Sequence, residues 1–179
     1  MLTTENLDIK IKEFWPKNGP PTKGIVKYVK KYLKEKIVIK CGGRVLLDPY
    51  LFDTFVNNIT ILKKLGLTPI VVHGGGPRIK KKLDELNIET KFIMGLRVTD
   101  EKIIKVVESV MIEFNKKIVN ALEKKGCFAK SITVKENNII QATKKNEALG
   151  FVGNPTKINV KIIKKFIEDD FIPVVSPMG

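Results

Sequence analysis

Two glycine-rich turns carry the residues of this sequence that are best suited to chemistry. The first contains Lys40, Gly42 and Gly43 at the end of a short apolar run. An ammonium group beside exposed backbone amides forms a site for an anion, and glycine lets a ligand approach those amides closely. This combination suits phosphoryl transfer, in which positioning and electrostatic stabilisation do most of the catalysis. Because the chain is rich in lysine, a solvated strand end is the alternative interpretation of Lys40.

The second turn contains three consecutive glycines, Gly74, Gly75 and Gly76, directly before Pro77. Proline favours the first position of a helix, so we expect the positive end of a helix to face this turn. A helix N-terminus beside free amides is a common site for an anion. One glycine would suffice for a tight turn, so three favour close approach of a ligand. The first turn is not a Walker P-loop, because Lys40 precedes its glycines and no Ser or Thr follows at the required spacing.

Arg97 is one of three arginines in a sequence with 33 basic residues, and it lies in a predicted loop between Gly95 and Thr99. Arginine binds a carboxylate through two parallel hydrogen bonds, which lysine cannot do. We therefore predict carboxylate recognition by Arg97, with a surface salt bridge to Asp100 or Glu101 as the alternative. The single histidine, His73, is predicted to be structural and satisfied by backbone groups.

The order of apolar runs predicts the elements that position these turns. The first 20 residues predict an irregular or mobile lead-in. Helices are expected near residues 22–33, 48–65, 77–86, 104–122 and 159–168, and strands near 37–39, 68–73, 91–94, 128–134, 139–142 and 172–176. The alternation predicts an α/β fold, an αβα sandwich with a mainly parallel central sheet. Asn137 and Asn138 predict a β-hairpin excursion between residues 128–134 and 139–142.

Composition excludes several classes of protein. No apolar run approaches the roughly 20 residues that cross a bilayer, and no secretion signal begins the chain, so we expect a cytoplasmic protein. The net charge of +14 suggests nucleic acid, but the lysines are scattered rather than gathered with aromatic residues. The two cysteines lie far apart and predict neither a disulfide framework nor a zinc site. We assign no metal ligand, because Asp48 and Asp100 are better explained as helix starts.

Four segments together resemble the acetylglutamate kinase family in order and spacing. They are IVIKCGG (37–43), IVVHGGGP (70–77), GLRVTD (95–100) and PVVSPMG (173–179). The first two segments are shared across the wider amino acid kinase family, which includes carbamate, uridylate and aspartate kinases, and the loop with Arg97 narrows the choice. The resemblance covers residues 36–179 and implies the amino-acid-binding half of the fold. Residues 1–35 form an N-terminal extension and helix that resembles the helix linking dimers into hexamers in arginine-inhibited members.

The resemblance implies a phosphate site at the first turn. Lys40 would stabilise the phosphoryl group in flight, with the amides of Gly42 and Gly43 near the same phosphate. ATP with Mg²⁺ would be the co-substrate. Arg44 stands where many members have asparagine, and residues 131–138 lack the family's glycine-rich pattern.

The resemblance also implies an acceptor site at the second turn. The amides of Gly74 and Gly75 would hold the reacting carboxylate of N-acetyl-L-glutamate, and Arg97 would bind its α-carboxylate. The product would be N-acetyl-L-glutamyl 5-phosphate, an intermediate of arginine biosynthesis. The family's nucleotide-binding half follows the segment that ends here, so this chain is expected to be a truncated form, inactive alone. The alternatives are another amino acid kinase, or a non-catalytic sensing or assembly module, in each case as a homo-oligomer without nucleic acid or membrane.

Overall fold

A parallel sheet of four strands forms the centre of the computed structural model, which describes residues 4–16, 19, 21 and 24–179. The strand order is β1-β2-β8-β5, and each neighbouring pair is parallel. The strands are β1 (Lys36–Cys41), β2 (Thr68–His73), β5 (Ala129–Ile132) and β8 (Ile172–Val175). Because parallel strands end at the same edge of a sheet, the residues that follow all four strands gather at one edge.

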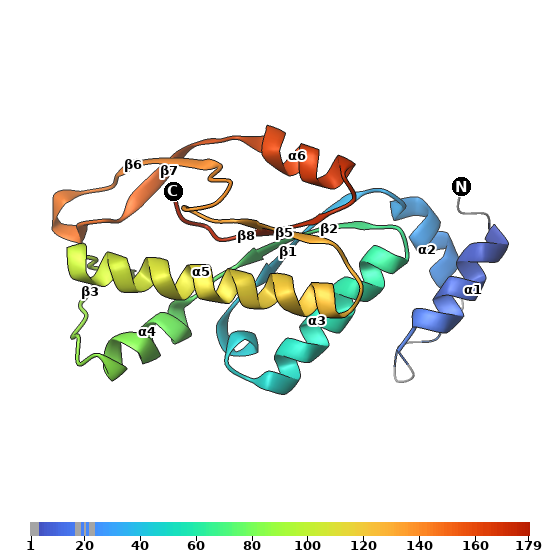
Figure 1. The fold of residues 1–179 in the computed structure, drawn as a ribbon, viewed down its shortest axis with the longest axis horizontal. Helices are drawn as coiled ribbons and strands as arrows, with labels where there is room; N and C mark the ends of the chain where they lie inside the picture. The colour runs from blue at the N-terminus through green and yellow to red at the C-terminus, as the bar shows by residue number, and fades with distance from the viewer. Residues whose placement is uncertain (1–3, 17–18, 20, 22–23) are drawn as a thin grey trace.

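Helices cover both faces of this sheet (Figure 1). On one face α3 (Pro49–Lys64) and α5 (Glu101–Lys124) bury a core around Val71, Phe114 and Ile118, with α4 (Gly76–Glu85) beside α5. On the other face α6 (Val160–Glu168) covers a core that contains Ile70 and Ile132. The predicted αβα sandwich with a mainly parallel central sheet is confirmed.

Side-chain caps begin the helices that frame the sheet edge. Asp48 accepts hydrogen bonds from the N–H groups of Tyr50 and Leu51 at 2.8 and 3.1 Å, and Pro49 follows it in the first turn of α3. Asp100 accepts a hydrogen bond from the N–H of Ile103 at 2.8 Å and begins α5. These contacts satisfy N–H groups that a helix cannot pair internally. Both aspartates therefore begin helices, as predicted.

The N-terminal region contains two helices, α1 (Thr4–Phe14) and α2 (Ile25–Tyr32). The prediction of an irregular lead-in over the first 20 residues is therefore wrong for 4–14. Leu7 and Ile11, which lie one turn apart, are each 2% exposed and pack in a cluster with Leu65 at the end of α3. Tertiary burial of this apolar stripe stabilises a short helix that its sequence alone would hold weakly. Thr22, the first residue of the predicted helix at 22–33, lies outside the described residues.

Two antiparallel hairpins lie outside the main sheet. They are β3 (Phe92–Ile93) with β4 (Leu96–Arg97), and β6 (Ile140–Lys144) with β7 (Gly153–Ile158); short helical turns η1 (Gly43–Leu46) and η2 (Glu147–Leu149) complete the fold. The predicted hairpin between 128–134 and 139–142 is wrong, because β5 is largely buried and pairs with β8, whereas the exposed β6 pairs with β7. The predicted strand at 91–94 shrinks to β3, which does not join the main sheet.

None of the helices in the described part of the chain is both long and apolar enough to cross a membrane.

Candidate functional site

The two glycine turns lie side by side at the carboxyl edge of the sheet. Lys40 and Cys41 of β1 are in register with Val72 and His73 of β2, so the two strands end together. The N–H of Gly74 then donates a hydrogen bond of 2.8 Å to the carbonyl of Cys41. This bond ties the start of the second turn directly to the start of the first. A ligand at one turn therefore lies within reach of the other.

Lys40 projects from the face of β1 that is opposite α3 and α5. Alternate residues of a strand point to opposite faces, and Ile39 and Cys41 pack into the core beneath α3 and α5. The side chain of Lys40 is exposed and lies along the first turn, because a Cβ placed on Gly42 would be 3.9 Å from Lys40 Cε. Its ammonium group is thus free to move over the glycine turns on the α6 side of the sheet.

The first turn has different reasons for its two glycines. Gly43 has a φ of +62°, a left-handed conformation that disfavours side chains. Gly42 has no such strain, and a Cβ there would make only ordinary contact with Lys40. The fold therefore requires glycine at position 43 but gives no reason for it at position 42.

The second turn also contains both a glycine that packing explains and glycines that it does not. A Cβ on Gly75 would overlap Sδ of Met111 and lie 3.2 Å from Cδ1 of Ile79, so glycine is needed for α5 and α4 to pack. A Cβ on Gly74 would meet nothing closer than the Cys41 carbonyl at 3.9 Å, and one on Gly76 would meet nothing within 4 Å. Neither of these glycines has a packing reason in the part of the chain that the structure describes. Access for a ligand is the remaining explanation.

The backbone donors of the second turn are not equivalent. The N–H of Gly74 is already used by Cys41, whereas the structure gives the N–H of Gly75 no partner among the described residues. Gly76 begins α4, whose first N–H groups have no partner within the helix. The donors offered to an anion are therefore those of Gly75 and Gly76, at the positive end of α4.

His73 is buried directly beneath the second turn and is 1% exposed. Its Nδ1 lies 3.2 Å from the carbonyl oxygen of Gly74, and its Nε2 lies 3.1 Å from Nδ2 of Asn115. Burial lowers the pKa of His73 below its ordinary value, and the hydrogen bond to Gly74 opposes that shift only in part. The imidazole is therefore buried with a partner at each nitrogen, but one of these partners is the side chain of Asn115 and not a backbone group as predicted.

Asn115 was missed by sequence reasoning, although the sequence carries a signal for it. It is fully buried at 0% exposure on the apolar stripe of α5 that includes Met111, Ile118 and Leu122. A polar residue within such a stripe needs a hydrogen-bond partner, because an unpaired buried amide is costly. The partners lie on β2 and β8, which the helical period cannot reveal.

Arg97 lies on β4 rather than in a loop at the sheet edge. Its Nη1 donates a hydrogen bond of 2.8 Å to Oγ1 of Thr90, and its guanidinium lies 4.7 Å from the ring centre of Phe92. Burial lowers the pKa of Arg97, and Asp84 partly offsets this. Among the described residues, no contact joins Arg97 to either glycine turn. Its predicted role therefore stays a prediction.

A cavity of about 380 Å³ lies near the segment that follows the Arg97 hairpin. Its walls come from α5, the β6–β7 hairpin and the segment after β8, and include Phe151, Val152 and Met178. The segment after Arg97 reaches it directly, because the carbonyl of Thr99 accepts a hydrogen bond of 2.7 Å from the N–H of Phe151. A mainly apolar cavity of this size suits the body of a small ligand, and none of its described lining residues belongs to either glycine turn.

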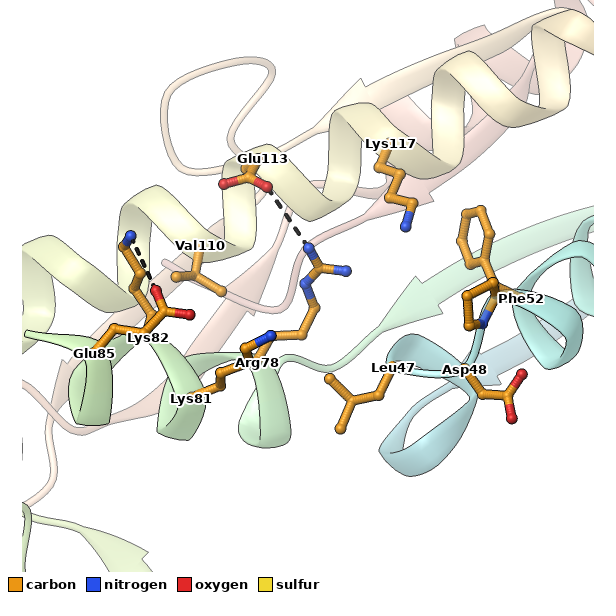
Figure 2. Close-up of a pocket in the computed structure, with 11 residues that line it drawn as sticks. Leu47, Asp48, Phe52, Arg78, Lys81, Lys82, Glu85, Val110, Glu113 and Lys117 are labelled. Atoms are coloured by element: carbon orange, nitrogen blue, oxygen red, sulfur yellow. Dashed lines mark hydrogen bonds and ion pairs between the residues drawn. The ribbon is translucent and has the colours of Figure 1, made fainter.

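A second cavity, of about 280 Å³, lies on the other side of the sheet between α3, α4 and α5 (Figure 2). Arg78 points toward Glu113 there, with 3.6 Å between Nη2 and Oε1, and Lys82 pairs with Glu85 at 3.3 Å. Lys40 projects from the opposite face, so this cavity is not the candidate site.

The described residues contain no group of three or more His, Cys, Asp or Glu side chains placed to hold a metal ion. We therefore assign no magnesium ligand to them.

The sequence pattern of the amino acid kinase family matches residues 35–179. The chain belongs to the amino acid kinase family. Among curated members, it is 54% identical to an acetylglutamate kinase of Pelagibacter ubique over 164 residues, which cover 92% of this chain and 57% of that protein. It is 42% identical to an acetylglutamate kinase of Petrotoga mobilis, over 84% of this chain and 51% of that protein. The chain thus spans about half the length of these relatives.

Solved structures agree with the amino acid kinase fold. The smu.665 protein of Streptococcus mutans has a TM-score of 0.68 and 28% identity over 80% of this chain and 59% of its own. An N-acetylglutamate synthase of Neisseria gonorrhoeae, solved with coenzyme A and N-acetyl-glutamate, has a TM-score of 0.74 and 17% identity over 88% of this chain and 37% of its own. The second likeness concerns the fold alone.

Proposed function

We propose that the complete protein containing this chain is an acetylglutamate kinase. It would transfer the γ-phosphoryl group of ATP to the side-chain carboxylate of N-acetyl-L-glutamate, giving N-acetyl-L-glutamyl 5-phosphate for arginine biosynthesis. The observation that carries this proposal is the hydrogen bond from Gly74 to Cys41, which joins the triple-glycine turn to the turn that follows Lys40 at one edge of the sheet. The 54% identity to a curated acetylglutamate kinase supports the choice of acceptor.

In this proposal the second turn binds the acceptor carboxylate and the first turn binds the phosphoryl group. An oxygen of the acceptor carboxylate attacks the γ-phosphorus, and the bond from that phosphorus to the bridging oxygen of ADP breaks. The N–H groups of Gly75 and Gly76 would hold the acceptor carboxylate. Lys40 would neutralise charge on the phosphoryl oxygens during transfer, beside the amides of Gly42 and Gly43. Stabilisation of this kind is worth most where water is excluded.

The rest of the acceptor would lie toward the Arg97 hairpin. The guanidinium has five N–H donors, of which the bond to Thr90 uses one, so Arg97 can also receive an α-carboxylate. The cavity beside Phe151 and Val152 would receive the apolar part of the acetyl group. We expect Mg²⁺ to arrive with ATP as part of the co-substrate.

We also propose that the protein is a homo-oligomer, a dimer or a hexamer formed through the N-terminal helix. Tyr28 and Tyr32 of α2 are 61% and 43% exposed. Exposed tyrosines on a short amphipathic helix are typical of a contact surface. Light scattering of the protein with and without residues 1–35 tests this proposal, and an unchanged mass would contradict it.

The activity is tested by trapping the acyl phosphate with hydroxylamine, which converts it to a coloured hydroxamate. The complete protein with ATP and Mg²⁺ should form hydroxamate from N-acetyl-L-glutamate and little from L-glutamate or L-aspartate. Equal product from L-aspartate would favour a different amino acid kinase. Binding of arginine without any hydroxamate would favour a sensing module.

A further inference from the structure

The side chains beneath the second turn form a chain of hydrogen bonds that leads from β8 to Gly74. Nδ2 of Asn115 lies 2.9 Å from the carbonyl oxygen of Val174 and 3.1 Å from Nε2 of His73. Nδ1 of His73 lies 3.2 Å from the carbonyl oxygen of Gly74. Asn115 and His73 are 0% and 1% exposed, so water does not compete for these contacts.

The direction of every hydrogen bond in this chain follows from its first acceptor. The carbonyl of Val174 can only accept, so the amide of Asn115 must present its NH₂ group there. The second hydrogen of that group then points at Nε2 of His73, which must accept. A neutral imidazole has one donor and one acceptor nitrogen, so Nδ1 carries the proton and donates it to the carbonyl of Gly74.

Planarity of the peptide bond transmits this contact to the ligand side. In a trans peptide the C=O of one residue and the N–H of the next point in opposite directions. Because the Gly74 carbonyl is held toward His73 on the α5 side, the N–H of Gly75 points toward the opposite side. That is the side from which Lys40 projects, since Ile39 and Cys41 occupy the α5 side.

We propose that His73 and Asn115 are positioning residues that aim the N–H of Gly75 at the acceptor carboxylate by holding the carbonyl of Gly74 in the interior. This proposal rests on the proposed function in one respect, namely that a carboxylate binds at the second turn. Neither residue touches the substrate. Their effect is to remove the freedom of one peptide plane before the ligand arrives, so that binding does not have to order it.

The chemistry around His73 agrees with this arrangement. Phe114 meets the imidazole edge-on with 5.2 Å between ring centres. Cys41, in register with His73 on β1, has its pKa raised to about 11 by burial and is an uncharged thiol at neutral pH. Burial likewise lowers the pKa of His73, which keeps the ring neutral and leaves Nε2 able to accept from Asn115.

The tautomer can be measured directly, because His73 is the only histidine in the sequence. Histidine labelled with ¹⁵N should give one pair of imidazole signals at pH 7, with Nδ1 protonated and Nε2 of the unprotonated type. Asn115→Leu should weaken this preference, because Nε2 loses its donor while the carbonyl of Gly74 still accepts from Nδ1. A protonated Nε2 in the wild-type chain, with or without a proton on Nδ1, would overturn the proposal.

A matched pair of substitutions separates positioning from packing. In His73→Asn the side-chain amide nitrogen takes the place of Nδ1 and can still donate to Gly74, but the ring is lost. In His73→Phe the ring is kept and the donor is lost. We expect His73→Phe to weaken binding of N-acetyl-L-glutamate roughly tenfold in calorimetry, the usual size for one lost hydrogen bond. His73→Asn should weaken it less, although it is the less stable of the two in urea.

The opposite ranking, with binding following stability, would show that His73 only fills space and would overturn the proposal. Thr60→Val is the control for a buried hydroxyl lost elsewhere, since Thr60 is 6% exposed and its hydroxyl donates to the carbonyl of Val56 within α3. It should leave binding unchanged. If the complete protein shows the expected tautomer but binds no N-acetyl-L-glutamate, this would contradict the proposed function and the ligand-facing half of this proposal. If His73 carries its proton on Nε2 in a protein that does bind N-acetyl-L-glutamate, the positioning role would be wrong and the proposed function would stand.

Discussion

Both glycine turns lead from a strand of the sheet into a helical segment, but they need glycine for different structural reasons. Each turn also contains glycine that its structural reason does not explain. In the first turn the backbone needs Gly43, whose φ of +62° suits the entry to η1. In the second turn packing needs Gly75, where a Cβ would overlap Met111. Gly42, Gly74 and Gly76 meet neither requirement. The comparison separates glycines that the fold demands from glycines that a ligand would demand.

The largest difference between the turns is the ammonium group of Lys40, which only the first turn carries. Lys40→Met should lower the turnover of the complete protein by about 10²–10³, the usual effect of removing one preorganised electrostatic stabiliser. Lys36→Met is the matched control, because Lys36 is an exposed lysine on the same face of β1 at the other end of the strand. Initial rates at saturating substrate measure both variants. Equal losses in the two would reduce Lys40 to a general surface charge.

Within the second turn, Gly75→Ala and Gly74→Ala should have opposite effects. Gly75→Ala forces a methyl group against Met111 and should cost about 1–3 kcal/mol in the free energy of unfolding, as overpacking usually does. Gly74→Ala should leave that free energy within about 0.5 kcal/mol of wild type, because its Cβ has room, while weakening ligand binding. Urea unfolding and calorimetry on the same samples give both values. A stable Gly75→Ala would show that the helix contact is not tight.

Within the first turn, substitutions at Gly43 and Gly42 should also differ in their effect on the free energy of unfolding, but by a smaller amount. Gly43→Ala places a side chain in the left-handed region and should cost about 1–2 kcal/mol, and Gly43→Asn should cost less because asparagine tolerates that region. Gly42→Ala should unfold like wild type but lower the affinity of the complete protein for ATP. If Gly42→Ala destabilised the chain as much as Gly43→Ala, the backbone alone would explain both glycines. Thermal and urea unfolding distinguish these results.

The smallest expected effect concerns pH, because only the second turn lies over an ionisable ring. Burial lowers the pKa of His73 in the folded state, so the unfolded state binds more protons as the pH falls below the ordinary histidine value of about 6.5. Stability from the neutral ring is therefore present above that pH and is lost below it. Unfolding free energies between pH 7.5 and 5.5 should fall more steeply for wild type than for His73→Phe. Parallel curves would contradict the lowered pKa.

Much of the frame could be predicted because its signals are local. Asp48 and Asp100 indicate helix starts because their side chains cap the helices that follow them. The apolar runs that form β1 and β2 lie directly before the glycines that these strands position. These features depend on neighbours within one turn or one strand. Their positions could therefore be predicted from the sequence.

What could not be predicted depends on partners distant in sequence. The helix that contains Leu7 and Ile11 is stabilised because these side chains pack against α3. Strand β6 pairs with β7 and not with β5, because the exposed residues of β6 do not suit the interior of the main sheet. In the site, Asn115 meets a residue 42 positions away and another 59 positions away. Gly75 looked like a ligand contact alone, yet Met111 also requires it. Periodicity identifies a buried face but not what packs against it.

The most direct test of the account is the change in backbone amide signals when the ¹⁵N-labelled chain is titrated with N-acetyl-L-glutamate. The account predicts that the largest shifts occur at Gly75 and Gly76, with smaller ones at Gly42 and at Arg97. It predicts none at Glu85 or Lys117, which line the cavity on the other face of the sheet. Shifts concentrated around that cavity, or a saturated complex in which both glycine turns are unmoved, would contradict it.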